Sequence, residues 1–156
     1  MTWLRATAPG TTEFDRVFGL RPELYDDFRR FVSLFWSLQA IDPDILDLCR
    51  LRIAQVLGGD TVPTIGAAGT GARTPPAEKV AALEEWRQAA VFTDRERACL
   101  AFAEKFVLQP HGVTDEDAAA VTAHLSDKEM IAFTEALAIL DGFTRFRIIL
   151  GIAGGD

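Results

Sequence analysis

The chain has 156 residues, a length that predicts one domain, residues 1–156, with enough volume to bury a hydrophobic core. Hydrophobic residues make up 49% of it and charged residues 25%, which is typical of a globular protein and excludes a disordered one. The formal net charge of −7 disfavours a nucleic-acid partner, and no apolar run reaches the roughly 18–20 residues of a membrane span, so no membrane partner is expected.

The N-terminal segment and the two cysteines indicate in which cellular compartment the protein is found. Residues 1–20 form an extension before the first strong helix signal, and they lack the apolar stretch of a signal peptide. We therefore expect a cytoplasmic protein. Cys49 and Cys99 form no CxxC pair and lack zinc-ligand spacing, so we expect no bound metal. Whether the two cysteines form a disulfide is left undecided, because a sequence gives no distance between two thiols.

Helix signals run along almost the whole chain, and no alternating strand pattern or hairpin turn interrupts them. Pro22 opens a first long helix, Asp42 caps a second that starts at Pro43, and Thr74 does the same for a helix over residues 75–91. Capping boxes predict three later starts. Their residue pairs are Thr93 with Glu96, Thr114 with Asp117, and Ser126 with Glu129. The sequence therefore predicts an all-α fold of six or seven helices.

Apolar residues recur at helical spacing on these segments. In the helix after Pro22 they form one continuous stripe. Its members are Leu24, Phe28, Phe31, Phe35 and Leu38. The last helix, residues 127–152, is apolar on most sides, which predicts a central helix, a subunit interface or both.

Residues 58–74 differ from the rest because glycines are frequent in them. Glycine disfavours a helix by about 0.5–1 kcal/mol relative to alanine. The segment is therefore either a loop or a small-residue helix that packs closely against a neighbour.

Three stretches carry a family resemblance. They read LDLCRLRIAQVLGG, FTDRERACLAFAEKFVLQPHGVTDED and AHLSDKEMIAFTEALAILDGFTRFRIILGI. Together they resemble the alkylhydroperoxidase D-like (AhpD-like) branch of the carboxymuconolactone decarboxylase superfamily, over residues 35–152. The resemblance implies an all-helical fold and assembly as a homotrimer or hexamer.

The redox members of that family place a CxxC motif and then a histidine after the helix that here reads RLRIAQ. Laid on this sequence, the two cysteines fall on Gly59 and Val62, and the histidine falls on Gly66. An acid upstream in the family falls on Asp47. Because a peroxidatic step requires a thiolate, the resemblance does not imply CxxC-dependent activity here.

The candidate catalytic groups are Asp47, Asp60 and His111. A carboxylate beside apolar walls, or an imidazole that titrates near neutral pH, can act as a general acid or base. Each also has a structural interpretation. Asp47 can pair with Arg50 on one helix face, Asp60 can cap a helix or lie in a loop, and His111 follows a proline in a loop.

The candidate substrate-binding groups are Arg145, Asp141, Trp36 and Tyr25. Arg145 offers a planar fork to a carboxylate, although Asp141, four residues earlier, can occupy it instead. Trp36 and Tyr25 can form the wall of an apolar pocket or simply belong to the core.

We therefore interpret the chain as a non-redox, cofactor-free enzyme that acts on a small organic molecule by acid–base chemistry. The reaction would take place at the site that CxxC occupies in relatives. A ligand-binding or structural protein without catalysis is the alternative. A thiol peroxidase that uses Cys49 and Cys99 is a third and weaker one.

Overall fold

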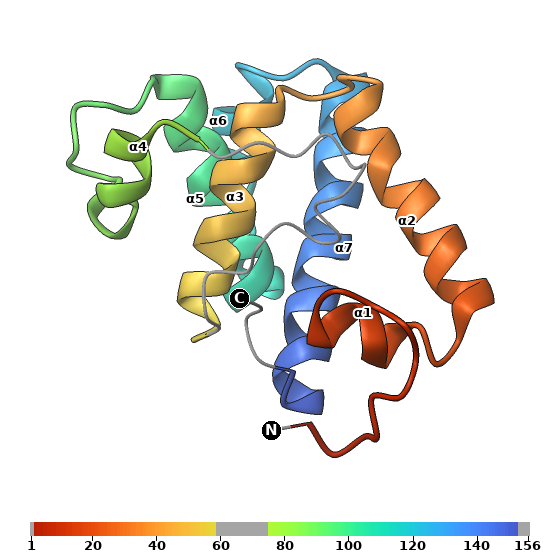
Figure 1. Cartoon of the computed structure of the whole chain (residues 1–156). Helices are drawn as coiled ribbons and strands as arrows, with labels where there is room; N and C mark the ends of the chain where they lie inside the picture. Colours follow the sequence, from red (N-terminus) through yellow and green to blue (C-terminus); the bar gives the residue numbers. More distant parts are fainter. Residues whose placement is uncertain (1, 59–74, 153–156) are drawn as a thin grey trace.

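The structure is a computed structural model that describes residues 2–58 and 75–152. In these two ranges the chain forms seven α-helices, two short 3₁₀ helices and no strand, which confirms the predicted all-α fold (Figure 1). The α-helices are α1 (Glu13–Phe18), α2 (Pro22–Ser37), α3 (Pro43–Val56), α4 (Ala77–Ala81), α5 (Asp94–Leu108), α6 (Asp115–Thr122) and α7 (Asp127–Leu150), and the 3₁₀ helices are η1 (Leu83–Glu85) and η2 (Pro110–Gly112).

Most helices begin where the local signals predict. Pro22 is the first residue of α2, and Asp42 caps α3 by accepting a hydrogen bond from the Asp44 backbone. The predicted capping boxes are all formed, at the starts of α5, α6 and α7. These boxes fix the chain direction at the helix ends and so set how α5, α6 and α7 enter the bundle.

The predicted helix over residues 75–91 is wrong in its extent. The chain forms α4 and then the 3₁₀ turn η1 instead. The break lets Leu83 and Trp86 both enter the core, where each is almost fully buried. The Trp86 indole also donates to the Glu104 carboxylate on α5, at 2.9 Å. A tertiary contact therefore decides where this helix ends.

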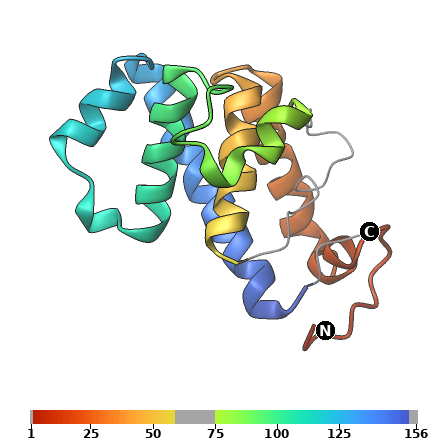
Figure 2. The ribbon, with the colours of Figure 1, turned by 90° about the vertical axis from the view of Figure 1, so that its left-hand side faces the viewer.

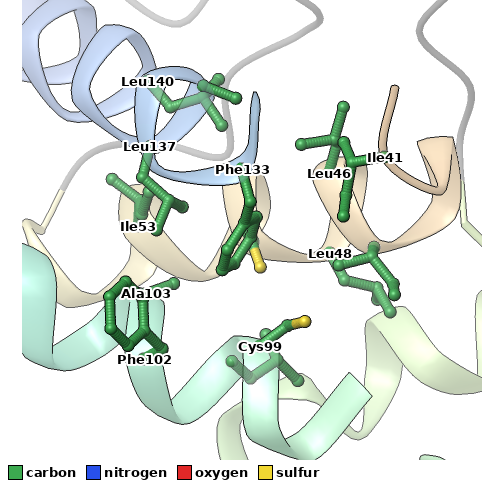
Figure 3. Packing of buried hydrophobic residues seen from close by; sticks show 14 of the residues in the cluster. Ile41, Leu46, Leu48, Ile53, Cys99, Phe102, Ala103, Phe133, Leu137 and Leu140 are labelled. Atoms are coloured by element: carbon green, nitrogen blue, oxygen red, sulfur yellow. The ribbon is translucent and has the colours of Figure 1, made fainter. Parts of the chain in front are cut away.

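The central helix of the bundle is α3, which packs against both α5 and α7 (Figures 1 and 2). Phe133 of α7 and Cys99 of α5 meet α3 side chains such as Leu46 and Ile53 in one apolar core (Figure 3). All four are essentially inaccessible to solvent. Buried apolar surface on three helices is thus the main source of stability in this part of the fold.

The last helix is less enclosed than its composition predicts. One side of α7 packs on α3, α2 and α5, whereas Ile131 on the other side is 70% exposed. The stripe on α2 is likewise only partly buried, because α2 turns Tyr25, Val32 and Phe35 inward. Leu38 remains 68% exposed.

The N-terminal extension contains α1, which packs on α2 and on the C-terminal end of α7 (Figure 1). Aromatic rings make these contacts. Phe18 lies against Phe28 and Phe143, and the rings of Phe28 and Phe143 stack with their centroids 3.8 Å apart. From α1 onward, the N-terminal extension is thus packed against the rest of the helical structure.

We predict that Phe133→Ala destabilises the protein by about 3–5 kcal/mol, because it leaves a cavity where α3, α5 and α7 meet. Ile131→Ala on the same helix serves as the control and changes stability by less than about 0.5 kcal/mol. Urea unfolding followed by circular dichroism measures both variants at one protein concentration. Equal effects of the two substitutions would contradict the core assignment.

Candidate functional site

A buried polar group lies where α2 and α3 meet. Asp47 on α3 is 0% exposed, and its Oδ1 accepts a hydrogen bond from Nε of Arg50 at 3.2 Å. Its Oδ2 accepts a longer contact from the Trp36 indole of α2, at 3.4 Å. The structure thus brings together Asp47 and Trp36, two of the residues singled out in the sequence.

The position of this group follows from the course of α3. Every residue of α3 from Ile45 to Leu51 is buried, so this part of the helix is enclosed on all sides and the Asp47 carboxylate lies in the interior. Burial lowers the pKa of Arg50, and the nearby Asp47 charge partly restores it. The hydrogen bonds from Arg50 and Trp36 hold the Asp47 carboxylate in one orientation, which suits a base or a fixed electrostatic partner for a ligand.

Several predicted positions lie outside the described residues. They are Asp60 and the three positions that correspond to the family's redox residues, Gly59, Val62 and Gly66. Gly58, the last described residue before this gap, has a left-handed backbone with φ of 70° directly after α3 ends. The catalytic role of Asp60 therefore stays a prediction.

The other candidates lie on different parts of the fold. The Tyr25 hydroxyl donates to Asp15 in the N-terminal aromatic cluster, and burial raises the pKa of Tyr25, assisted by that hydrogen bond. His111 is exposed in η2, after α5. Neither residue lies on α3, and their proposed roles at the Asp47 site stay predictions.

Arg145 and Asp141 form the predicted pair on α7. Arg145 Nε donates to Asp141 Oδ1 at 2.8 Å, and another guanidinium nitrogen donates to the Val107 carbonyl of α5 at 2.9 Å. The pair therefore fastens α7 to the end of α5. Arg145 is nevertheless exposed in part, and its remaining N–H donors can reach an anion.

The two thiols are free and lie inside the core, Cys49 on α3 and Cys99 on α5. Burial raises the pKa of Cys49, and the neighbouring Cys99 raises it further. Burial also raises the pKa of Cys99, to about 12. The thiolate is the reactive form of cysteine, and the burial and raised pKa of both thiols disfavour a peroxidatic role.

The structure contains a second buried polar cluster that the sequence did not reveal. Glu104 of α5 accepts hydrogen bonds at Oε1 from Arg52 Nε, at 2.5 Å, and from the Trp86 indole, and at Oε2 from Arg87. Burial alone would raise the pKa of Glu104, but these bonds from Trp86, Arg52 and Arg87 lower it below its ordinary 4.5.

The sequence did contain one signal for this cluster. Glu104 lies between Leu100 and Val107 at helical spacing, so an acid falls within an apolar face. A glutamate in such a position is almost never buried without a cationic partner. The partner itself was not predictable, because Arg52 is 52 residues away in the chain.

A metal site or a membrane-spanning helix would indicate a broad class of function. Within residues 2–58 and 75–152, no three His, Cys, Asp or Glu side chains are placed to share a metal ion. In the same ranges, no helix is both long enough and apolar enough to cross a membrane.

Comparison with known proteins identifies the fold. A crystal structure from Agrobacterium tumefaciens, at 18% identity, matches with a TM-score of 0.67 over 86% of this chain and 92% of its own. It is described as a protein of unknown function, with a suggested identity as the antioxidant defence protein AhpD. The chain therefore has the AhpD-like helical fold.

Sequence comparison gives a weaker relationship. The uncharacterised protein YnjA of Escherichia coli K12 is 28% identical over 112 residues, which are 72% of this chain. The match spans 62% of YnjA, so this chain corresponds to about six-tenths of that relative. No family model matches the chain.

We predict that acid weakens the fold through Glu104. Its pKa is lowered on folding, so its contribution to stability is present above pH 4.5 and is lost as the pH falls through the folded-state value. Glu104→Gln should lower the free energy of unfolding by about 2 kcal/mol at pH 6, since hydrogen bonds to charged groups are each worth about 1.5–3 kcal/mol. Urea unfolding at pH 6, 4.5 and 3 measures this difference, which should shrink toward pH 3. A difference that is the same at all three pH values would contradict this role.

Proposed function

We propose that the protein is a thiol-independent member of the AhpD-like superfamily that binds a small organic molecule and performs acid–base chemistry on it with Asp47. The single observation that carries the proposal is the buried Asp47 carboxylate, held between Arg50 and Trp36. No cofactor enters the proposal.

The state of the thiols supports the thiol-independent part. Cys49 and Cys99 are enclosed in the core, and both have raised pKa values. A hydroperoxide would have to reach a buried, protonated sulfur, which is a poor nucleophile.

The cost of burying charge supports a functional role for Asp47. An ion pair in a protein interior often stabilises no more than apolar side chains of the same size would. Asp47 and Arg50 occupy the centre of a helix that is otherwise apolar on that side. A ligand that enters beside them would find a base, a cation and an indole already oriented.

We also propose Arg145 and Asp141, on α7, as electrostatic anchors for a charged group of a ligand. Their support is the rigid attachment of Arg145 to α5 through the Val107 carbonyl, together with the exposure of its guanidinium. Trp36 would contribute an apolar wall with a single N–H donor.

A structural role is the second candidate. Both Asp47 oxygens already have partners within the chain, which is how a purely structural buried ion pair is satisfied. In that case, Asp47 would fasten α2 to α3 and would never meet a substrate.

Solvent deuterium exchange separates the two candidates. A base that removes a proton from an acidic C–H bond, and then returns a deuteron, exchanges that position in D₂O. We predict that the protein accelerates exchange in at least one member of a panel of 2-oxo acids and unsaturated lactones, followed by proton NMR. Asp47→Asn should abolish the acceleration, because the amide keeps the shape and can still accept from Trp36 but cannot take the proton.

The double substitution Cys49→Ala/Cys99→Ala is the matched control and should leave the exchange rate unchanged. Exchange at the wild-type rate in Asp47→Asn, or no acceleration by wild-type protein for any compound, would favour the structural role. Loss of exchange in the cysteine variant, with the fold intact, would revive thiol chemistry.

We also propose that the protein assembles with copies of itself, as a trimer or hexamer. Apolar side chains on the outer side of α2 support this, among them Leu34 and Leu38, and so does the exposed Ile131 of α7. Exposed apolar groups that gather on one surface commonly mark a subunit interface.

Size-exclusion chromatography with light scattering tests the assembly. Wild-type protein should elute at three or six times its chain mass of 17.1 kDa. Leu34→Lys/Leu38→Lys should shift the mass toward one chain, because each copy would have to bury two added charges in its contact. Ser33→Lys/Ser37→Lys, one position earlier on the same helix, should not. A wild-type monomer would overturn the proposal.

A further inference from the structure

An open cavity of about 330 Å³ lies between α5, α6 and the segment after η1. Four charged side chains line it: Arg87, Glu104 and Lys105, with Asp117 from α6. Ala101 and Leu108 of α5, both exposed to solvent, add apolar surface to the lining. The volume is at the lower end of those that hold small organic ligands.

The two carboxylates of this cavity already have their partners. Glu104 accepts from Arg52, Arg87 and the Trp86 indole. Asp117 Oδ2 accepts from Lys105 and also from the backbone and hydroxyl of Thr114, at 2.8 and 2.7 Å. Both acids have lowered pKa values, about 2 for Asp117, so they stay ionised. Glu104 accepts hydrogen bonds at both oxygens, and Asp117 accepts them at Oδ2.

The two cations have donors to spare. A guanidinium carries five N–H donors and an ammonium carries three. Within the described residues, Arg87 donates only to Glu104, and Lys105 donates only to Asp117. Arg87 is 60% exposed, and its guanidinium is held over the Trp86 ring at 4.3 Å. The cations are therefore oriented before any ligand arrives, which lowers the entropic cost of binding.

The net charge of the side chains at the cavity indicates the charge of the ligand. Two cations, Arg87 and Lys105, and two carboxylates line the cavity. Arg52, which bonds to one of these carboxylates, adds a third cation. The excess is one positive charge, which a singly charged anion neutralises. The apolar surface of Ala101 and Leu108 favours an anion with a hydrocarbon part over an inorganic ion.

We propose that this cavity binds a small organic monocarboxylate, with the carboxylate between Arg87 and Lys105 and the hydrocarbon part against Ala101 and Leu108. The site is separate from Asp47. Arg52, which supports Glu104, faces α5, whereas Asp47 faces α2. The inference does not depend on the function proposed for Asp47.

Titration of the full-length ¹⁵N-labelled protein with sodium benzoate at constant ionic strength tests the site. Benzoate should move the amide signals of Arg87 and Lys105 and the indole signal of Trp86 in a saturable way. Benzamide, which has the same shape without the charge, should bind at least about tenfold more weakly. Inorganic phosphate serves as the probe for a site that takes any anion.

Two variants and two controls complete the experiment. Arg87→Gln and Lys105→Gln should each weaken benzoate binding about tenfold or more. Arg30→Gln and Lys128→Gln, exposed cations on other helices, should not. Asp47→Asn should bind benzoate normally, which distinguishes failure here from failure of the catalytic proposal.

The proposal is overturned if benzoate shifts do not saturate, if benzamide binds equally well, or if both cation variants keep the wild-type affinity. Phosphate binding as tight as that of benzoate would overturn the assignment to an organic monocarboxylate. Circular dichroism establishes that each variant is folded, and since Arg87 and Lys105 come from separate segments, either one alone suffices for the test.

Discussion

The enclosure of α3 governs the chemistry available to this fold. Nearly every residue from Ile45 to Ala54 is buried, so a polar side chain on α3 must find its partner inside the protein. An unpaired charge there would cost several kcal/mol. Asp47 meets this requirement with Arg50 and Trp36 on the side of α2. Arg52 meets it with Glu104 on the side of α5. One helix thus organises two polar centres that face different neighbours.

The parts of the fold that the sequence predicted correctly are those decided locally. Asp42 and Pro43 begin α3, and the Ser126 capping box begins α7, because each signal acts within about one helical turn. The helix expected over residues 75–91 failed for the opposite reason. Its end depends on the contact of Trp86 with Glu104, 18 residues further along the chain. No pattern within the segment contains that information.

The same distinction holds for the polar residues. The pairing of Asp47 with Arg50, and of Asp141 with Arg145, followed from helical spacing. The approach of Trp36 to Asp47 did not, because it depends on how α2 packs against α3. Likewise, the periodicity of α2 revealed its apolar residues but not which of them face inward. Gly59 and Val62, the positions onto which the family resemblance places the CxxC cysteines, lie outside the described residues, so their role rests on the resemblance alone.

The location of Cys49 and Cys99 has a practical consequence. Both sulfurs are buried where α3 and α5 pack together, and because burial raises their pKa, both are protonated at neutral pH. An alkylating reagent can reach them only while these helices separate. The rate of labelling therefore measures how often the centre of the molecule opens, without any cysteine having to be introduced. A bound molecule that holds the bundle closed would slow that reaction, whatever the molecule is.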